Sequence, residues 1–430
     1  MKSFAAEGYA IGIVILLLSV SMTSFTSASN NGNAQITVDA KIANIIKMVN
    51  ESLLRGYIKA LVECGPRATG TYDCEKAAKY IYEQFNGSNL DVRYQDWKSY
   101  GNRYNLNFFK SQNVEATQEG TDNSDQETLI FNAHYDSVSV SPGANDDGSG
   151  TAAVLAAAYV LSKFEFKHTI KFVTFSGEEQ GLLGSRAYAN EIYNNNENVL
   201  VEFNADMIGY AETRKGGGSF RITGTKDVSW IMDDIKQINE GYGINFSISS
   251  SIIAGEKRGG SDYFEFIQYG YNSISFWQSE FNSKYYHTSN DNIEHVNFSY
   301  LVNTTKIIVG ALAYLADIDN VHPQIKIAAP ERGKIYYKGR IEGSTGYRES
   351  SLINSMLVCA EVTPGNAPID RVEFYYDGKL KFTDTELPFQ WLLNERSFGH
   401  HEIKVVVYDK QGRNTSDKME IFSINLFKKR

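Results

Sequence analysis

The stretch between residues 128 and 204 constrains the fold more than any other part of the sequence, because short apolar runs alternate there with longer stretches of helical periodicity. The short runs predict buried strands, and the longer stretches, the first of them rich in alanine, predict helices. In chain order the predicted elements are a strand over 128–133, a helix over 150–164, a strand over 169–175, a helix over 182–193 and a strand over 199–204. This alternation predicts an α/β fold whose mainly parallel sheet is covered by helices on both faces.

Further helical and strand patterns flank this core. Helical periodicity runs over 38–62 and again over 77–85, with a Gly-Pro break between the two stretches. After the core, residues 272–276 predict another buried strand and residues 301–316 predict a closing helix. We therefore expect one α/β domain that occupies residues 30–318.

The pattern changes at residues 319–323. Beyond this point the apolar runs are short and β-like, at 356–362, 372–376 and 403–408, and no helical period remains. Asp377-Gly378 between two apolar runs is a hairpin signal. Residues 323–430 are therefore predicted to form a separate all-β sandwich domain.

The N-terminus carries one apolar run, residues 9–20, followed by small and hydroxyl residues up to Ser29. Such a run is shorter than the roughly 20 residues that a membrane-spanning helix needs, and a small-residue segment follows it as in a signal peptide. We expect residues 1–29 to be a signal peptide and the mature protein to be secreted, free of the membrane. Because Glu7 offsets the positive charge of Lys2, an uncleaved anchor remains the alternative.

The composition narrows the class of protein. With 42% hydrophobic and 22% charged residues the chain falls in the ordinary globular range. The formal net charge of −9 and the lack of a long basic run argue against nucleic acid as a partner. Three cysteines do not make a disulfide framework, but in an exported chain we expect a local Cys64–Cys74 bridge, with Cys359 left unpaired.

Charged residues follow each predicted strand of the core. His134 and Asp136 come directly after the first strand, the Glu178-Glu179 pair lies just after the second, and Asp206 lies just after the third. Because ligands bind beyond the carboxyl ends of the strands in an open parallel sheet, these side chains are expected to meet in one crevice.

Two further segments reach the same edge of the sheet. Asp146 and Asp147 lie in the glycine-rich loop before the alanine-rich helix, and His287 lies in a loop after the strand at 272–276. Histidines and carboxylates that converge in an exported protein match the ligand set of hydrolytic zinc. The candidate ligands are His134, Asp146, Glu179, Asp206 and His287. Five residues exceed one site and supply two if one carboxylate bridges, and two metals ~3.5–4 Å apart that share a hydroxide are a known device for amide hydrolysis.

Each of these short motifs also has an ordinary structural interpretation. A His-x-Asp segment is commonly a surface hydrogen-bonded pair, adjacent glutamates are commonly solvated charge at a helix start, and Asp-Asp-Gly is commonly a turn. Their joint placement at successive strand ends favours the metal site. Glu178 is then left free for proton transfer.

Five ordered motifs carry a resemblance to a known family. They are His134-Tyr-Asp136, Gly143-Ala-Asn-Asp-Asp-Gly-Ser-Gly150, Ser176-Gly-Glu-Glu-Gln-Gly-Leu-Leu-Gly-Ser185, Asn204-Ala-Asp-Met-Ile208 and Tyr286-His-Thr288. Together they resemble the co-catalytic zinc aminopeptidases of the bacterial leucyl and Streptomyces type over roughly residues 45–318. The tail resembles bacterial immunoglobulin-like domains. The resemblance implies an α/β/α sandwich with a mixed sheet, of the phosphorylase/hydrolase-like kind.

The resemblance also implies roles for the site residues. Asp146 would bridge two zinc ions, with His134 and Asp206 on one ion and Glu179 and His287 on the other. Asp136 would hold the ring of His134 in its ligating tautomer, and the Asp146–Asp147 peptide would be cis. Glu178 would be the general base, and the hydroxyl of Tyr286 would stabilise the oxyanion. The expected protein is a secreted, monomeric aminopeptidase with two Zn²⁺ per chain, which acts on the free N-termini of peptides or proteins.

Other functions on the same scaffold stay open. A glutaminyl cyclase shares this fold but uses one zinc ion and performs no hydrolysis, and a carboxypeptidase or dipeptidase is a further candidate. From another class, the chain could be an inactive binding module. The complete ligand set together with Glu178 favours the two-metal hydrolase.

Overall fold

A computed structural model of the chain describes residues 38–101, 107–122, 127–253, 260–281, 284–318, 323–345, 349–365, 367–410 and 412–426. The predicted signal peptide lies outside the described residues. The described chain contains an α/β part up to Ile318 and an all-β part from Pro323 onward.

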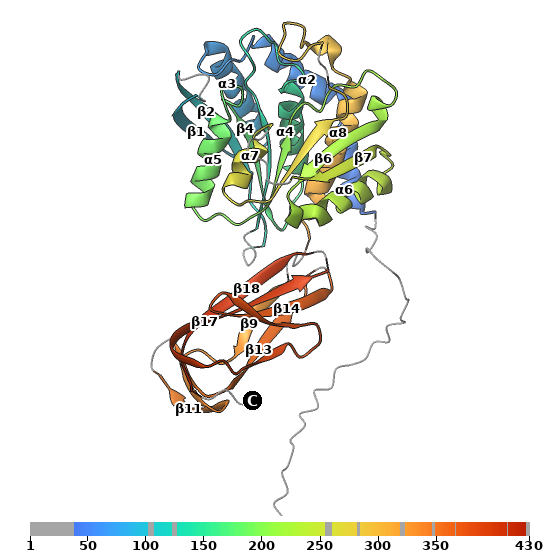
Figure 1. Ribbon diagram of the computed structural model, residues 1–430. Helices are drawn as coiled ribbons and strands as arrows, with labels where there is room; N and C mark the ends of the chain where they lie inside the picture. Colours follow the sequence, from blue (N-terminus) through green and yellow to red (C-terminus); the bar gives the residue numbers. More distant parts are fainter. Residues whose placement is uncertain are drawn as a thin grey trace, which may run out of the picture. The chain divides into compact units, whose positions relative to one another are not determined.

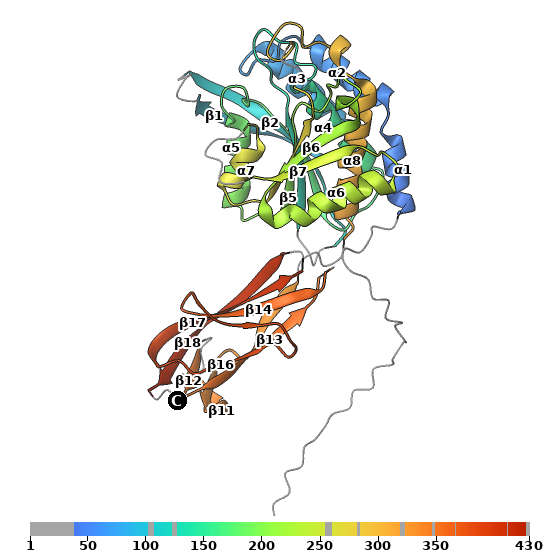
Figure 2. The same ribbon diagram turned by 45° about the vertical axis from the view of Figure 1, so that its right-hand side comes forward.

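The α/β part is built on one eight-stranded mixed sheet (Figures 1 and 2). Its strands are β1 (Asp91–Tyr100), β2 (Phe108–Gln118), β3 (Thr128–His134), β4 (Thr169–Phe175), β5 (Val199–Ala205), β6 (Ser219–Gly224), β7 (Ser247–Ile252) and β8 (Ser273–Gln278). The spatial order is β1-β2-β4-β3-β5-β8-β6-β7. The neighbours β4, β3, β5 and β8 are parallel, whereas β2 pairs antiparallel with β4 and β6 pairs antiparallel with β8.

Helices cover both faces of this sheet. They are α1 (Ala40–Met48), α2 (Glu51–Glu63), α3 (Tyr72–Gly87), α4 (Gly148–Leu161), α5 (Leu183–Asn194), α6 (Ser229–Gly241), α7 (Tyr263–Gln268) and α8 (Phe298–Leu315). Side chains of β3 separate the two faces, since Phe131 belongs to the core shared with α4 and α8, and Ile130 to the core shared with α5 and α7. This three-layer arrangement confirms the predicted fold class.

The central elements form for simple local reasons. Every residue of β3 is buried, as expected for a strand that is covered on both faces. In α4 the alanines allow close packing, and nearly all of its residues are buried. The carboxylate of Asp147 caps this helix by accepting a hydrogen bond from the backbone N–H of Gly150. The end of β3 and the start of α4 are thereby fixed next to each other.

Several parts of the α/β layer depart from the sequence prediction. The helical stretch at 38–62 is two helices, because Asn50 adopts extended backbone and caps α2 through the backbone N–H of Leu53. The antiparallel pair β1–β2, the strands β6 and β7, and helices α6 and α7 were not predicted. The antiparallel pairs make the sheet mixed, which agrees with the mixed, mainly parallel sheet that was predicted.

Among the described helices, α8 alone is long and apolar enough to cross a membrane by length and composition. However, 72% of its apolar window is buried inside the protein. It packs against α1, α4 and α6 within the main hydrophobic core. We therefore interpret α8 as a core helix.

The all-β part consists of a seven-stranded and a three-stranded sheet. Its strands are β9 (Gln324–Ala329), β10 (Lys334–Tyr337), β11 (Arg340–Ser344), β12 (Ser350–Ile353), β13 (Met356–Thr363), β14 (Ile369–Tyr376), β15 (Lys379–Asp384), β16 (Gln390–Leu393), β17 (Ser397–Asp409) and β18 (Asn414–Asn425). The orders are β11-β10-β12-β18-β17-β14-β15 and β16-β13-β9.

Both sheets of the all-β part contribute to one hydrophobic core, which includes Val358, Phe374 and Val405. The predicted hairpin at Asp377-Gly378 is confirmed, since these residues join the antiparallel strands β14 and β15 and both have positive φ. The immunoglobulin-like character of this part and the domain boundaries at 318 and 323 stay predictions.

The predicted Cys64–Cys74 disulfide is wrong. Both cysteines are free, and so is Cys359. Cys64 ends α2 and turns its thiol back to donate to the carbonyl oxygen of Ala60, at 3.3 Å. Cys74 lies on the buried side of α3, where it belongs to the hydrophobic core. Although the two cysteines are close in sequence, their sulfur atoms do not bond. The thiol of Cys64 donates to a backbone oxygen of α2, whereas that of Cys74 packs in the hydrophobic core.

Candidate metal centre

The predicted ligands lie at the carboxyl ends of three adjacent parallel strands. His134 is the last residue of β3, Asp206 directly follows β5, and Glu179 lies in the turn between β4 and α5. Since β3 pairs with both β4 and β5, these three positions are neighbours across the sheet. The side chains of His134, Glu179 and Asp206 are all nearly or fully buried.

The two ring nitrogens of His134 face different partners. Nδ1 lies 3.1 Å from the backbone oxygen of Asp136 and 3.5 Å from its carboxylate. Nε2 lies 3.4 Å from Oδ1 of Asp146 and 3.8 Å from Oδ1 of Asp206. With a proton on Nδ1 donated to Asp136, the lone pair of Nε2 points to the space between the carboxylates.

His287 forms a second group of the same kind. Its Nε2 lies 3.1 Å from Oδ2 of Asp146 and 3.1 Å from Oε2 of Glu179. The two oxygens of Asp146 thus face two different imidazoles, Oδ1 toward His134 and Oδ2 toward His287. The structure brings all five predicted ligands together, with Asp146 between the two groups.

Asp147 is an alternative to Asp146 as the carboxylate beside His134 and Asp206. Ligand atoms within 4.8 Å of one another occur in two sets, Asp146, Glu179 and His287 in one and His134, Asp147 and Asp206 in the other. Oδ1 of Asp147, however, accepts hydrogen bonds from the backbone N–H groups of Gly150 and Met207, at 2.8 and 3.1 Å. Because Asp147 is committed to the helix start, we assign the shared position to Asp146. The predicted cis peptide between Asp146 and Asp147 is confirmed.

The donor set fits zinc. Oε1 of Glu179 and Oδ1 of Asp206 are buried without a hydrogen-bond partner. In the described parts of the chain no lysine or arginine pairs with the carboxylates of Asp146, Glu179 or Asp206. The carboxylates of Asp146 and Glu179 raise the pKa of the His287 imidazole to about 10. The space between these three side chains therefore favours a positive charge. Two imidazoles and three carboxylates around such points are ligands that zinc accepts.

The carboxylate of Asp136 ties the ligand strands together. It is fully buried and accepts a hydrogen bond from the hydroxyl of Thr69 at 3.0 Å. It also accepts the backbone N–H groups of Glu178 and Glu179, at 3.3 and 3.4 Å. Asp136 therefore orients the turn after β4 as well as the ring of His134.

Glu178 lies in the tight turn that follows β4. Gly177 has a φ of +81°, and a Cβ atom there would lie 2.7 Å from the ring of Trp97, so the turn requires glycine. Burial raises the pKa of Glu178 well above its usual range, and the charges of Asp262 and Asp206 raise it further. Glu178 lines a cavity of about 330 Å³ that is also lined by His134, Asp146, Asp206, Tyr286 and His287.

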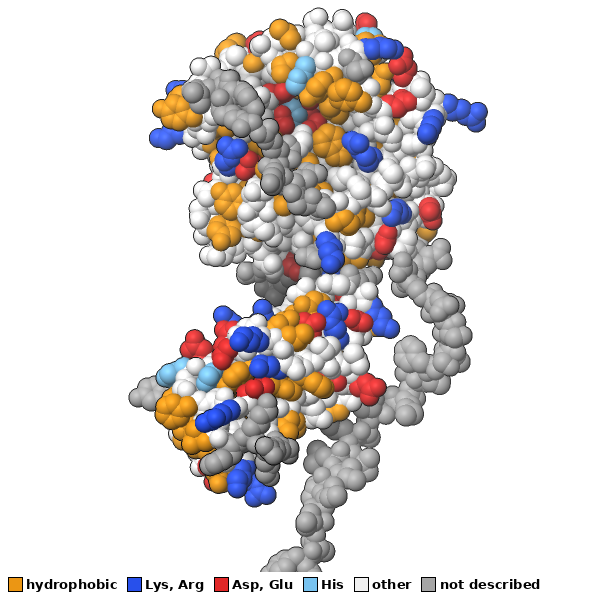
Figure 3. All heavy atoms as spheres, in the orientation of Figure 1, with side chains coloured by type: hydrophobic (Ala, Val, Ile, Leu, Met, Phe, Trp, Pro, Cys, Tyr) orange, Lys and Arg blue, Asp and Glu red, His pale blue; other side chains and the backbone are white. Residues whose placement is uncertain are grey.

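The cavity combines charged and aromatic walls. The ring of Tyr286 stacks on that of His287, with centroids 3.7 Å apart. Trp277 and Phe281 line the same cavity. In Figure 3, imidazole and carboxylate side chains gather beside hydrophobic ones on the visible face of the α/β part. The site therefore offers metal ligands next to an apolar surface.

A family model described as peptidase family M28 matches residues 113–312. These residues, called the M28 segment below, are 200 of the chain's 430 residues, somewhat less than half. The M28 segment contains all five candidate ligands, together with Glu178, Asp136 and Tyr286.

Curated relatives of the M28 segment are named aminopeptidases. Aminopeptidase YwaD of Bacillus subtilis (strain 168) is 31% identical over 207 residues, which are 47% of this chain and 44% of the relative. Leucine aminopeptidase 1 of Ajellomyces capsulatus (strain H88) is 32% identical over 213 residues, 45% of this chain and 54% of the relative. The chain thus spans about half the length of the curated relatives that it matches.

Solved structures share the fold of the M28 part. An aminopeptidase from Aneurinibacillus sp. strain AM-1 has a TM-score of 0.56 at 19% identity and covers 64% of this chain and 96% of its own. A glutaminyl cyclase from Fimbriiglobus ruber has a TM-score of 0.53 at 17% identity and covers 62% and 95%. At such low identity the likeness establishes the fold and does not choose between the two chemistries.

Sequence reasoning missed two residues that hold the metal-site loop. Arg67 is fully buried, and its guanidinium donates to the backbone oxygens of Tyr135, Pro142 and Gly143. Asp291 accepts the backbone N–H groups of Asn145 and Asp146, both at 3.0 Å. Asp291 ends the segment that starts at the M28 motif Tyr286-His-Thr288, which is the one signal that could have found it. Nothing in the sequence marked Arg67.

Sequence reasoning also missed Asp262, which directly precedes the first residue of α7. It is fully buried, and burial raises its pKa to about 7. Its charge also raises the pKa of Glu178, so the two carboxyl groups belong to one electrostatic environment.

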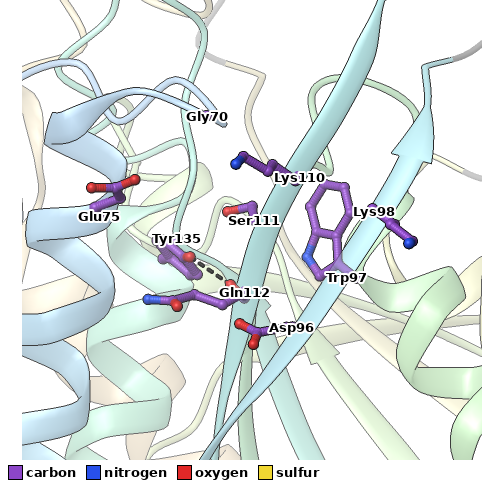
Figure 4. A pocket seen from close by; sticks show the side chains of 9 residues that line it. All are labelled: Gly70, Glu75, Asp96, Trp97, Lys98, Lys110, Ser111, Gln112 and Tyr135. Atoms are coloured by element: carbon purple, nitrogen blue, oxygen red, sulfur yellow. Dashed lines mark hydrogen bonds between the residues drawn. The ribbon is translucent and has the colours of Figure 1, made fainter.

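A second cavity lies beside the first two strands of the α/β part, β1 and β2. It measures about 720 Å³ and is lined by residues that include Trp97, Lys110, Gln112 and Tyr135, but by none of the five ligands. Figure 4 shows Glu75 on α3 across from the strands β1 and β2, and the hydrogen bond from the hydroxyl of Tyr135 to the backbone oxygen of Gln112. Although larger, this cavity does not contain the candidate metal centre, because none of the five candidate ligands lines it.

Proposed function

We propose that this protein is a zinc-dependent aminopeptidase that hydrolyses the N-terminal peptide bond of peptides and holds two zinc ions per chain. The observation that carries the proposal is the position of Asp146. Its two oxygens face two imidazoles, and each imidazole has a further carboxylate beside it, Asp206 in one case and Glu179 in the other. One bridging carboxylate with two separate pairs of ligands supports a two-metal centre.

The residues present assign the ligands. His134 and Asp206 would hold one ion, Glu179 and His287 the other, and Asp146 both. When bound, the zinc ions would polarise the scissile carbonyl group and lower the pKa of a bound water toward ~7. Asp136 keeps the proton of His134 on Nδ1, so that Nε2 stays available as a ligand.

Glu178 supplies the proton transfer. It lines the cavity beside the ligands without belonging to either ligand set. As general base its carboxylate takes the proton of the attacking water, and as general acid it returns the proton to the leaving amine. The phenol of Tyr286 lies in the same cavity, and burial raises its pKa, so it stays protonated and can donate to the developing oxyanion.

The preference for a free N-terminus follows from charge. A substrate ammonium entering this cavity meets the carboxylates of Glu178 and Asp206, whereas an acetylated nitrogen brings no positive charge to them. The names of the relatives agree with this proposal, since both are called aminopeptidases.

The proposal is tested with aminoacyl-p-nitroanilides and their N-acetylated counterparts, each with added zinc and with a chelator. We expect release of nitroaniline from the free aminoacyl compounds only, with loss of activity in the chelator and recovery on addition of zinc. Cleavage of the acetylated compounds at a similar rate would refute the aminopeptidase proposal.

A glutaminyl cyclase is the second candidate, favoured by the shared fold with the cyclase from Fimbriiglobus ruber. A peptide with N-terminal glutamine separates the two. Hydrolysis releases free glutamine and a shortened peptide, whereas cyclisation releases ammonia and leaves the peptide at full length. Mass spectrometry of the products therefore decides between them, and we expect the shortened peptide.

The location and organisation of the protein belong to the same proposal. We propose export after removal of residues 1–29, a monomer in solution, and domains at 30–318 and 323–430. N-terminal sequencing of protein recovered from the medium should begin near Asn30. Light scattering should give the mass of one chain, and limited proteolysis should cut first at residues 319–323.

A further inference from the structure

Arg221 is a cationic residue in the wall of the reaction cavity. It lies on β6, directly opposite Trp277 on β8, and both side chains line the cavity of about 330 Å³ that also contains the metal ligands. The guanidinium carbon lies 5.6 Å from the Trp277 ring, which restricts the directions that the guanidinium can take. Among the described residues that line this cavity, no other lysine or arginine occurs.

Arg221 has no carboxylate partner among the described residues, although Glu280 lines the same cavity. The carboxylate of Glu280 is engaged elsewhere. It accepts the backbone N–H groups of Glu212 and Thr213, at 2.7 and 3.1 Å, and the hydroxyl of Thr213. A Cβ atom on Gly216 would overlap Glu280, so its carboxyl group is directed at that turn. Within the described parts of the chain, no carboxylate therefore pairs with the positive charge of Arg221.

The cavity consequently has two charged ends. Carboxyl groups line the metal end, where Glu178 lies outside both ligand sets, and Arg221 provides positive charge in the wall formed by β6 and β8. A substrate whose N-terminal residue is acidic carries both an ammonium group and, a few bonds away, a side-chain carboxylate that can pair with Arg221. A guanidinium binds a carboxylate through two parallel hydrogen bonds, which makes this contact stronger and more selective than one to a neutral amide.

We propose that Arg221 is a specificity-determining residue that selects substrates whose N-terminal residue is glutamate or aspartate. This inference rests on the proposed aminopeptidase function and names its substrate class. Trp277 and Phe281 line the same cavity and offer apolar contact to the methylene groups of such a side chain. Arg221 touches the side chain of the substrate and takes no part in proton transfer.

The test compares glutamyl-p-nitroanilide with glutaminyl-p-nitroanilide, which have the same shape and differ in charge. Neither compound has a C-terminal carboxylate, so the side chain is the only anionic group that Arg221 can meet. In the full-length zinc enzyme we expect kcat/KM for the glutamyl compound to exceed that for the glutaminyl compound by about tenfold, mainly through KM. Arg221→Gln should bring the ratio close to one, and Arg221→Lys should restore part of it.

Arg214→Gln is the matched control, because Arg214 is exposed in the nearby turn and does not line the cavity. It should leave the ratio unchanged, and leucyl-p-nitroanilide should be cleaved equally well by the wild type and Arg214→Gln. Calorimetric titration with L-glutamate and L-glutamine gives a readout that does not depend on turnover. Glutamate should bind more tightly than glutamine to the wild type and equally to Arg221→Gln.

The outcomes separate this inference from the function on which it rests. If leucyl and glutaminyl compounds are cleaved but the wild type shows no preference for glutamyl over glutaminyl, the inference fails and the aminopeptidase function stands. An unchanged preference in Arg221→Gln has the same meaning. If no compound with a free N-terminus is cleaved, the proposed function fails and the inference with it.

Discussion

The buried carboxylates of the candidate metal centre differ from those of the all-β part in how their charge is balanced. In the all-β part each is accompanied by its own guanidinium, with Asp409 at 2.6 Å from Arg413 and Glu373 at 2.7 Å from Arg371. In the α/β part Asp146, Glu179 and Asp206 face histidines and one another, and no lysine or arginine of the described chain pairs with them. A buried carboxylate with its own guanidinium is a structural ion pair, whereas three clustered carboxylates without one favour a bound cation.

The largest effect that this comparison predicts is on turnover. Glu178→Gln removes the group that moves protons but changes no ligand of the proposed metal centre. We expect kcat to fall by about 10³-fold or more while the free energy of unfolding stays nearly unchanged. Steady-state kinetics with leucyl-p-nitroanilide measures this, with Glu280→Gln as a control in the same cavity, for which kcat should change far less. A variant Glu178→Gln with ordinary kcat would remove Glu178 from the mechanism.

A smaller effect is expected on the stability of the all-β part. Asp409 accepts both the backbone N–H and the Nε–H of Arg413, at 3.0 and 2.6 Å. Asp409→Asn leaves the buried guanidinium without its negative partner and should cost about 3–5 kcal/mol. Chemical denaturation followed by tryptophan fluorescence measures the loss, while zinc content and kcat should stay as in the wild type.

The exposed pair of Asp370 and Arg371 provides the control for that variant. Asp370→Asn should change the free energy of unfolding by about 0.5 kcal/mol or less, since exposed pairs contribute little. If Asp409→Asn is equally mild, the buried ion pair is not a structural element and the contrast between the two parts is weakened.

Glu202 is a third kind of buried carboxyl group. It lies within β5 with neither a cation nor a place in the ligand clusters, and its side chain accepts hydrogen bonds from Asn132 and Ser273. Burial raises its pKa to about 8. The group therefore stays protonated in the folded protein at neutral pH, where the unfolded chain has released the proton.

This difference has a definite sign. Between the unfolded value near ~4.3 and the folded value the native state binds the extra proton, so the free energy of unfolding falls as pH rises through this window. Glu202→Gln keeps the shape without the titration and should be more stable than the wild type by about 2–4 kcal/mol at pH above 8, with little difference near pH 4. Chemical denaturation at several pH values gives the free energy of unfolding as a function of pH for the wild type and for Glu202→Gln. Parallel slopes would show that Glu202 does not titrate in this way.

The centre of the fold and the convergence of the candidate ligands were predictable because both depend on strong local signals. The strands β3, β4 and β5 are continuous apolar runs, and a single topological rule places their ends together. The cysteine pair shows where proximity in sequence fails, since the directions of α2 and α3 decide which atoms meet.

The missed elements lack such signals. The strand β7 is a run of serine and isoleucine that is exposed over most of its length, so no apolar pattern marks it. The antiparallel strands β1 and β2 are polar on much of their surface and form only through cross-strand pairing. Arg67 acts through backbone oxygens of residues some 70 positions away in the chain, which no local pattern encodes.

The zinc content of two neighbouring variants tests the central claim most directly. Glu179→Gln replaces a proposed ligand by a neutral amide, whereas Glu178→Gln replaces a residue outside both ligand sets. Atomic emission analysis after dialysis should give two zinc ions per chain for the wild type and for Glu178→Gln. Glu179→Gln should retain about one and recover partly at high zinc concentration. If Glu178→Gln is the zinc-deficient variant, or if both variants keep two ions, the proposed division between base and ligand is wrong.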